Sequence, residues 1–175
     1  MPDVEGRRLT GFWLRHQPAG GLPLARRDPP PDNRWQRGEV VDALYLADSE
    51  ATVWAEWYRH LAERGLPPGA AMPRDLWRWQ VDVEVADLSD AARLSALGLP
   101  VPRPGRRSWA AFQEVGERLA EAGWAGVLAP SAARPDGRAL CLFRRRDGGA
   151  VPGARPVPPP RRVDRPPAPP TGMVT

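Results

Sequence analysis

The sequence contains no lysine, so all 25 basic residues of the 175-residue chain are arginine. They are balanced by 21 acidic residues, which leaves a net charge of only +4. Proteins that bind nucleic acid usually concentrate positive charge on one face, whereas arginine here alternates with aspartate and glutamate along the chain. We therefore expect a mixed, solvated surface, and the composition does not favour binding to nucleic acid.

Cysteine and histidine are scarce as well. The single cysteine, Cys141, lies in the apolar run 139–143, which excludes a disulfide framework and a cysteine-based metal site. We interpret Cys141 as a core residue. The two histidines, His16 and His60, fall in different segments without acidic partners at ligand spacing. The sequence therefore predicts no metal centre.

Long hydrophobic runs and glycine-rich motifs are also missing. No segment approaches the roughly 18 apolar residues that a membrane-spanning helix needs, and residues 1–8 lack the apolar stretch of a signal peptide. We expect a cytoplasmic protein. Neither Gly-x-Gly-x-x-Gly nor a P-loop is present to hold a phosphate, and no Gly-x-Ser-x-Gly turn supports a Ser-His-Asp triad.

Short strands and helices alternate irregularly in the first 147 residues. The clearest strand is Trp77–Val85, where Trp and Val alternate with polar residues. A helix is expected after a cap at Asp48 or Ser49, and it ends at Gly65. The other expected strands are 12–15, 43–47, 125–129 and 138–143, and the other expected helices are 90–97 and 109–122. This order has no strict βαβ repeat, and it predicts an α+β fold of small, mostly antiparallel sheets flanked by about three helices.

The C-terminal part has a different composition. The chain has 23 prolines, heavily clustered there, and no hydrophobic period continues beyond about Gly148. We therefore predict a domain over residues 1–147 and a disordered, Pro/Arg-rich tail over 148–175.

Five side chains stand out in or beside the apolar elements: Arg15, Arg34, Tyr45, Glu56 and Ser131. Each has an ordinary structural explanation when taken singly. Glu56 can pair with Arg59 or His60 on a solvated helix face. Tyr45 can be a core aromatic, and Ser131 can cap a turn after a proline. Only their order and spacing across several segments favours a functional interpretation.

That order resembles the RES-domain family, which is named for its Arg, Glu and Ser. The matching stretches span residues 12–143 and are Trp13-Leu14-Arg15, Asn33-Arg34-Trp35, Ala43-Leu44-Tyr45-Leu46-Ala47-Asp48-Ser49 with Glu56, Gly126-Val127-Leu128-Ala129-Pro130-Ser131-Ala132, and Gly137 to Phe143. The chain departs from the family pattern at two places. His16 stands where the family often has an aromatic residue, and Asp32-Asn33 replace glycines before Arg34.

The resemblance implies a fold like that of ADP-ribosyltransferases, with NAD+ as substrate and no cofactor. Characterised members of the family are toxins of toxin–antitoxin pairs that degrade NAD+ by hydrolysis or phosphorolysis, or transfer ADP-ribose to a protein. Carried over by position, the resemblance makes Glu56, Arg15 and Ser131 catalytic, and it makes Arg15, Arg34, Tyr45 and Ser131 NAD+-binding. An Xre-like antitoxin and a second copy of the chain are the protein partners that it allows.

These residue types suit the implied chemistry. Arginine offers a planar, bidentate fork to a diphosphate, and the Tyr45 ring can stack on the nicotinamide cation. A carboxylate such as Glu56 can stabilise the oxocarbenium character that develops on the ribose. The Ser131 hydroxyl can bond the substrate's amide or a ribose oxygen.

We therefore expect an enzyme that cleaves the nicotinamide–ribose bond of NAD+, as a glycohydrolase or a phosphorylase. Two alternatives stay open at this point: a mono-ADP-ribosyltransferase that modifies a protein, and a non-catalytic module that contacts nucleic acid. The sequence does not decide whether water, phosphate or a protein is the acceptor. The expected enzyme requires residues 15, 45, 56 and 131 to meet at one pocket.

Overall fold

The computed structural model describes residues 4–144 and 151–174. Within them, six strands form one hydrogen-bonded sheet in the order β1-β2-β5-β4-β3-β6, and a further pairing of β1 with β3 closes five of the strands into a ring. The pairings are antiparallel except for a short parallel one between β3 and β4. The predicted α+β class is confirmed.

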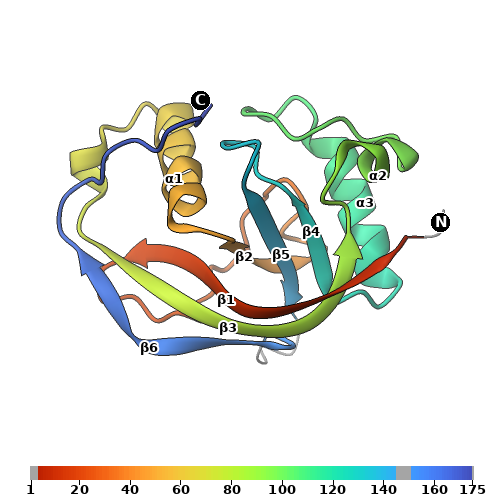
Figure 1. Cartoon of the computed structure of the whole chain (residues 1–175), viewed down its shortest axis with the longest axis horizontal. Helices are drawn as coiled ribbons and strands as arrows, with labels where there is room; N and C mark the ends of the chain where they lie inside the picture. Colours follow the sequence, from red (N-terminus) through yellow and green to blue (C-terminus); the bar gives the residue numbers. More distant parts are fainter. Residues whose placement is uncertain (1–3, 145–150, 175) are drawn as a thin grey trace.

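The strands are β1 (Gly6–Pro18), β2 (Asp42–Ala47), β3 (Arg74–Asp87), β4 (Gly126–Pro130), β5 (Arg138–Arg144) and β6 (Ala154–Val163). The helices are α1 (Glu50–Arg64), α2 (Ala91–Ala96), α3 (Trp109–Glu121) and the short 3-10 helix η1 (Pro68–Ala71). In Figure 1, β1, β3 and β6 curve along the bottom of the molecule. Helix α1 stands above one end of these strands, and α2 and α3 stand above the other.

The long ladder between β1 and β3 forms the base of the fold. Strand β3 alternates buried and exposed residues from Trp77 to Val85, as predicted from the sequence. It pairs residue by residue with the whole of β1, from Gly6 to Pro18. Strand β1 is longer than the predicted 12–15, because its N-terminal half is mostly exposed and is held by this ladder rather than by an apolar pattern of its own.

The proline-rich C-terminal segment departs from the sequence prediction. We expected a disordered tail over 148–175, and this is wrong for residues 154–163, which form β6 along β3. Among the described strands, β6 pairs with β3 alone, and an edge strand tolerates proline because its outer N–H positions need no partner. The strand is largely exposed, so it carries no hydrophobic period. The predicted boundary at residue 148 lies outside the described residues.

Helix α1 has the termini that its sequence predicts. The Ser49 hydroxyl accepts a hydrogen bond from the Thr52 amide at 3.2 Å, and Gly65 ends the helix at a φ of 63°. The left-handed conformation at this position favours glycine. Behind α1, the Tyr58 hydroxyl donates to the carbonyl oxygen of Pro167, so the segment after β6 lies against the helix.

Three clusters of buried side chains form the core, one inside the curved strands, one under α2 and α3, and one under α1. Most tryptophans belong to the core, as predicted from the sequence; the buried ones are Trp13, Trp35, Trp54, Trp57, Trp77, Trp79 and Trp109. Cys141 is 1% exposed, and burial raises the pKa of its thiol to about 12, which fits a core residue. Over residues 4–144 and 151–174, we find no helix with the length and apolarity of a membrane span.

Candidate functional site

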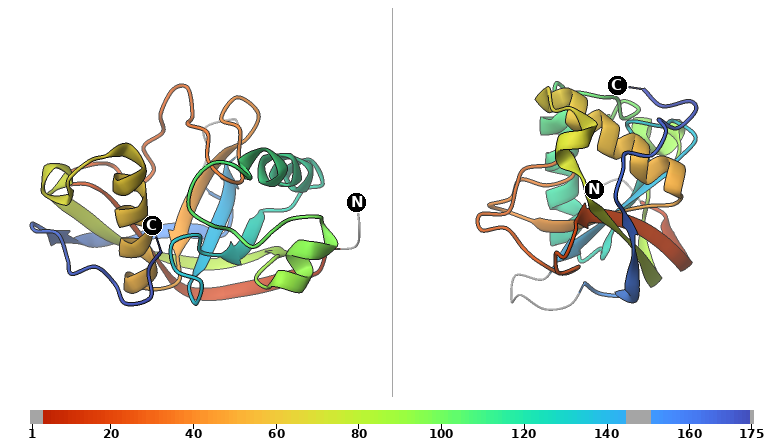
Figure 2. Two further views of the ribbon diagram at one scale, coloured as in Figure 1. Left: turned by 90° about the horizontal axis from the view of Figure 1, so that it is seen from above. Right: turned by 90° about the vertical axis from the view of Figure 1, so that its left-hand side faces the viewer.

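A cavity of about 530 Å³ lies between α1, β1, β2 and the segment 19–41, which loops out between α1 and α3 when seen from above (Figure 2). Four of the five candidate side chains line it, namely Arg15, Arg34, Tyr45 and Glu56. Ser131 does not line the wall, although its neighbours Pro130 and Ala132 do. The volume falls within the range of about 300–1,000 Å³ that is typical of small-molecule sites.

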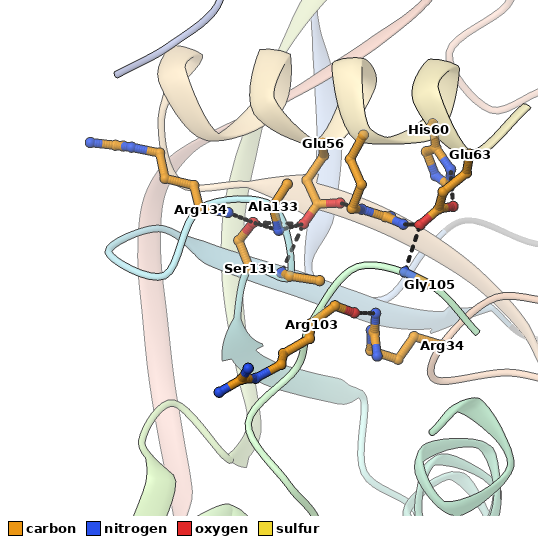
Figure 3. A network of polar contacts seen from close by, with 11 residues as sticks. Arg34, Glu56, His60, Glu63, Arg103, Gly105, Ser131, Ala133 and Arg134 are labelled. Atoms are coloured by element: carbon orange, nitrogen blue, oxygen red, sulfur yellow. Dashed lines mark hydrogen bonds and ion pairs between the residues drawn. The ribbon is translucent and has the colours of Figure 1, made fainter. Parts of the chain in front are cut away.

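Glu56 is fixed by hydrogen bonds from the loop that follows β4 (Figure 3). Its Oε1 accepts from the Ser131 hydroxyl at 2.6 Å and from the amides of Ala132 and Ala133 at 3.1 and 3.3 Å. The Ser131 oxygen in turn accepts from the amides of Ala133 and Arg134 at 3.2 and 3.1 Å. Ser131 therefore holds the Glu56 carboxylate by a hydrogen bond and does not itself line the cavity.

The second oxygen of Glu56 pairs with Arg59 on the next turn of α1. Arg59 Nε donates to Glu56 Oε2 at 2.9 Å, and Arg59 also bonds Glu63, whose Oε1 accepts from the Gly105 amide at 2.9 Å. Burial acts to raise the pKa of Glu56, but Arg59 and the Ser131 hydrogen bond outweigh it and hold this pKa below its usual value. The carboxyl group is therefore ionised at neutral pH.

Arg15 and Tyr45 lie side by side on β1 and β2. Arg15 Nη1 donates to the Tyr45 carbonyl oxygen at 3.1 Å, and the Trp35 amide donates to the Tyr45 hydroxyl at 3.1 Å. The second contact ties the segment 19–41 to the sheet. Burial, followed by Cys141, raises the pKa of Tyr45 well above its usual value, so the hydroxyl stays protonated and the Tyr45 ring remains neutral.

Arg34 reaches the site from the segment 19–41. Its Nη2 donates to the carbonyl oxygen of Arg103, and its guanidinium lies over the Phe112 ring, 5.2 Å from the centroid. Burial and the repulsion of Arg59 lower the pKa of Arg34, while Glu56 acts in the opposite direction. Figure 3 shows Arg34 with its hydrogen bond to the Arg103 carbonyl, on the same side of α1 as Glu56 and Glu63.

The family model of the RES domain matches residues 7–164. The chain belongs to the RES domain family. The resemblance predicted from residues 12–143 is confirmed, and the matched span also includes residues 151–164 of the C-terminal part, with β6 inside it.

A curated relative of this RES domain is a probable NAD(+) phosphorylase, Rv3189, from Mycobacterium tuberculosis. It is 29% identical over 138 residues, which cover 78% of this chain and 66% of the relative. The chain thus spans slightly less than two thirds of the length of that protein.

A solved structure with a similar fold is that of the M. tuberculosis MbcT–MbcA toxin–antitoxin complex. The likeness has a TM-score of 0.73 at 22% identity and covers 91% of this chain and 86% of the matched chain. At this identity the comparison establishes the fold.

The structure adds residues to the RES site that sequence reasoning did not assign to it. Arg59, Arg74, Arg144 and His16 all line the cavity. The spacing of Arg59 from Glu56 did indicate an ion pair, which is confirmed, but it gave no sign that the pair is buried. The sequence around Arg74 and Arg144 does not distinguish them from the other arginines. Only the folded positions of β3 and β5 bring them to the cavity.

The Tyr45 hydroxyl gives a first prediction. Tyr45→Phe should lower the free energy of unfolding by about 1–3 kcal/mol, because it leaves the buried Trp35 amide without an acceptor. Urea denaturation measures the change. Tyr58→Phe is the matched control: it removes the one other tyrosine hydroxyl, which donates to the carbonyl of Pro167 near the surface. A larger loss in Tyr58→Phe than in Tyr45→Phe would contradict the proposed anchoring of segment 19–41.

Proposed function

We propose that this RES domain binds NAD+ in the cavity and cleaves its nicotinamide–ribose bond, with water or inorganic phosphate as the acceptor. The observation that carries the proposal is the ionised Glu56 carboxylate, held at the wall of a cavity whose other charged side chains, in the described part of the chain, are almost all arginine. The family of the chain and its likeness to a probable NAD(+) phosphorylase support the same activity.

The chemistry of the bond explains why an ionised carboxylate suits this site. When the glycosidic C–N bond breaks, nicotinamide leaves with the bonding electron pair as a neutral ring, so no general acid is required. Positive charge develops on the ribose instead, and a fixed carboxylate stabilises it. An oxygen of water or phosphate then bonds to the ribose carbon, and when water attacks, its proton passes to solvent.

The arginines and Tyr45 account for the rest of the substrate. The diphosphate carries two negative charges, which suit the guanidinium groups of Arg15 and Arg34. The Tyr45 ring stays neutral and lines the same cavity, so it is available to stack on the cationic nicotinamide ring. Ser131 contributes indirectly through its hydrogen bond to Glu56.

Mono-ADP-ribosyl transfer to a protein is the second candidate, since it uses the same cation and differs in the acceptor alone. Binding to nucleic acid is less well supported, because several exposed arginines are paired with carboxylates. Examples are Arg8 with Asp82 and Arg161 with Glu50.

Incubation with NAD+ tests the proposal. We expect loss of NAD+ and release of nicotinamide, with free ADP-ribose when phosphate is absent and ADP-ribose 1-phosphate when phosphate is the acceptor. The products are separated by ion-exchange chromatography and identified by mass spectrometry. ADP-ribose bound covalently to a protein would instead support ADP-ribosyl transfer. Intact NAD+ together with salt-dependent DNA binding would support the nucleic-acid alternative.

An antitoxin partner and a cytoplasmic location are further parts of this proposal. The similar fold occurs in a toxin–antitoxin complex, and an enzyme that destroys NAD+ inside the cell that makes it requires an inhibitor. The substrate is intracellular, so the enzyme acts in the cytoplasm. Expression of this chain alone should arrest the growth of cells. Co-expression with an Xre-like protein from a neighbouring gene should restore it.

A further inference from the structure

Three strands each bring an arginine to the cavity. Arg15 lies on β1, Arg74 is the first residue of β3, and Arg144 is the last residue of β5. All three line the cavity. Burial, then Arg144, then Arg74 lower the pKa of Arg15 to about 10, so Arg144 and Arg74 both lie within electrostatic reach of Arg15.

Little negative charge compensates this cluster. Among the residues that the structure describes, two carboxylates line the cavity, Asp42 and Glu56, against seven arginines. Asp42 is already hydrogen-bonded to Arg26 at 2.8 Å and lies 4.0 Å from Arg144 Nε. Glu56 is committed to Arg59 and to the loop after β4.

Each of the three guanidinium groups also has a buried donor that no other described residue uses. The Nε atoms of Arg15, Arg74 and Arg144 are buried and have no hydrogen-bond partner among residues 4–144 and 151–174. One terminal nitrogen of each group bonds a neutral acceptor: Arg15 Nη1 the Tyr45 carbonyl, Arg144 Nη1 the Leu24 carbonyl at 3.2 Å, and Arg74 Nη2 the His16 ring at 2.7 Å. A buried donor without a partner destabilises the folded protein, so three such donors around one cavity favour the binding of an acceptor there.

His16 holds Arg74 without adding to the positive charge. Its Nδ1 is 2.7 Å from Arg74 Nη2, and its ring stacks on Trp54 with 5.4 Å between the centroids. Burial and the two neighbouring arginines, Arg74 and Arg15, keep the pKa of His16 well below its usual value, and His60 acts in the same direction. The ring is therefore neutral and accepts the hydrogen bond from Arg74. The residue that departs from the family's aromatic position thus orients an arginine.

We propose that Arg74 and Arg144 complete, together with Arg15, a subsite for a phosphate group in the cavity. A phosphate offers several oxygens with delocalised negative charge, which match both the unused donors and the uncompensated charge. The group has two sources within the proposed function, on which this inference rests: the diphosphate of NAD+, or free inorganic phosphate that acts as the acceptor. Arg34, which lies within reach of Glu56, is a separate cation of the same cavity.

Direct binding tests the subsite without requiring turnover. The full-length chain is titrated with inorganic phosphate and with pyrophosphate by calorimetry, and its thermal unfolding is followed with and without each anion. We expect Arg74→Gln and Arg144→Gln each to weaken the binding of at least one anion by about 10- to 100-fold, the effect of losing one charge-assisted hydrogen bond. Arg118→Gln removes an exposed arginine from α3 and serves as the control of equal charge.

Stability distinguishes this role from a structural one. A subsite variant should unfold at the same temperature as the original chain or higher when no anion is present, because it relieves repulsion, and it should lose the stabilisation by the anion. A lower unfolding temperature with the anion effect intact in both variants would overturn the subsite. Unchanged affinity for phosphate and for pyrophosphate in both variants would overturn it as well.

Kinetics identify the source of the phosphate. If the variants raise the KM for phosphate and leave the KM for NAD+ unchanged, the subsite binds the acceptor phosphate. If they raise the KM for NAD+ and leave the KM for phosphate unchanged, the subsite binds the diphosphate of NAD+. If the chain leaves NAD+ intact but binds phosphate through Arg74 and Arg144, the proposed function fails while the subsite stands. If NAD+ is cleaved with both KM values unchanged in both variants, the subsite is wrong and the function stands.

Discussion

Glu56→Gln should lower kcat for NAD+ cleavage by a factor on the order of 10²–10³, the effect of removing one preorganised electrostatic contact to a transition state. Glutamine has nearly the same shape, and its carbonyl oxygen can still accept from Ser131 and from the amides of Ala132 and Ala133. The substitution therefore removes the charge and leaves most of the framework. Because that charge acts on the oxocarbenium character of the ribose, kcat should fall far more than KM rises.

Nicotinamide release under saturating NAD+ measures this loss. Circular dichroism and the unfolding temperature establish that the variant is folded. Glu114→Gln is the matched control, because Glu114 is an exposed glutamate on α3 away from the cavity. Turnover that stays within a few-fold of the original chain in a folded Glu56→Gln variant would remove Glu56 from the reaction.

The sequence predicted the local features of this fold well, because those features depend on local chemistry. The Ser49 cap and the Gly65 stop bound α1 where they were expected, and the alternation in Trp77–Val85 defines β3. Strand β6 could not be predicted in the same way. It is held by its pairing with β3, some eighty residues earlier in the chain, and its prolines resemble those of a disordered segment.

The candidate site shows the same difference between features that depend on the local sequence and features that depend on the folded chain. Spacing and resemblance placed Arg15, Arg34, Tyr45 and Glu56, and the structure gathers all four around one cavity. The position of Ser131 behind Glu56 depends on how the loop after β4 turns, which spacing does not encode. In a chain whose basic residues are all arginine, nothing local distinguishes Arg59, Arg74 or Arg144 from arginines on the surface. Burial and the approach of separate strands distinguish them, and both are properties of the folded chain.

Arg59→Met should lower the free energy of unfolding at neutral pH by about 3 kcal/mol, the lower end of the range for a broken buried ion pair. Arg59 is 7% exposed at its side chain and Glu56 is 23% exposed, so the carboxylate keeps some contact with solvent. Methionine fills a similar volume without a charge. Urea denaturation at pH 7 measures the loss.

The pH dependence of this loss has a defined sign. In the original chain the pKa of Glu56 is below its usual value, so its charged form stabilises the fold at neutral pH, and this contribution disappears as the pH falls through the folded-state pKa. Arg59→Met removes the largest interaction that lowers the pKa of Glu56 and leaves burial opposed mainly by the Ser131 hydrogen bond, so this pKa should rise. The charged form of Glu56 then stabilises the variant less than it stabilises the original chain. The stability difference between the two proteins should therefore be largest at neutral pH and should shrink below about pH 4.5.

Activity should report the same shift. If cleavage requires the ionised carboxylate, the acid limb of kcat against pH lies below the usual glutamate range in the original chain and moves to higher pH in Arg59→Met. Arg59→Lys keeps the positive charge but not the paired guanidinium contacts, so its acid limb should move less. An Arg59→Met variant with unchanged stability and an unmoved acid limb would show that the Ser131 loop alone keeps Glu56 ionised. A double-mutant cycle with Glu56→Gln separates the two contributions, because the effect of losing Arg59 should largely vanish once the carboxylate is gone.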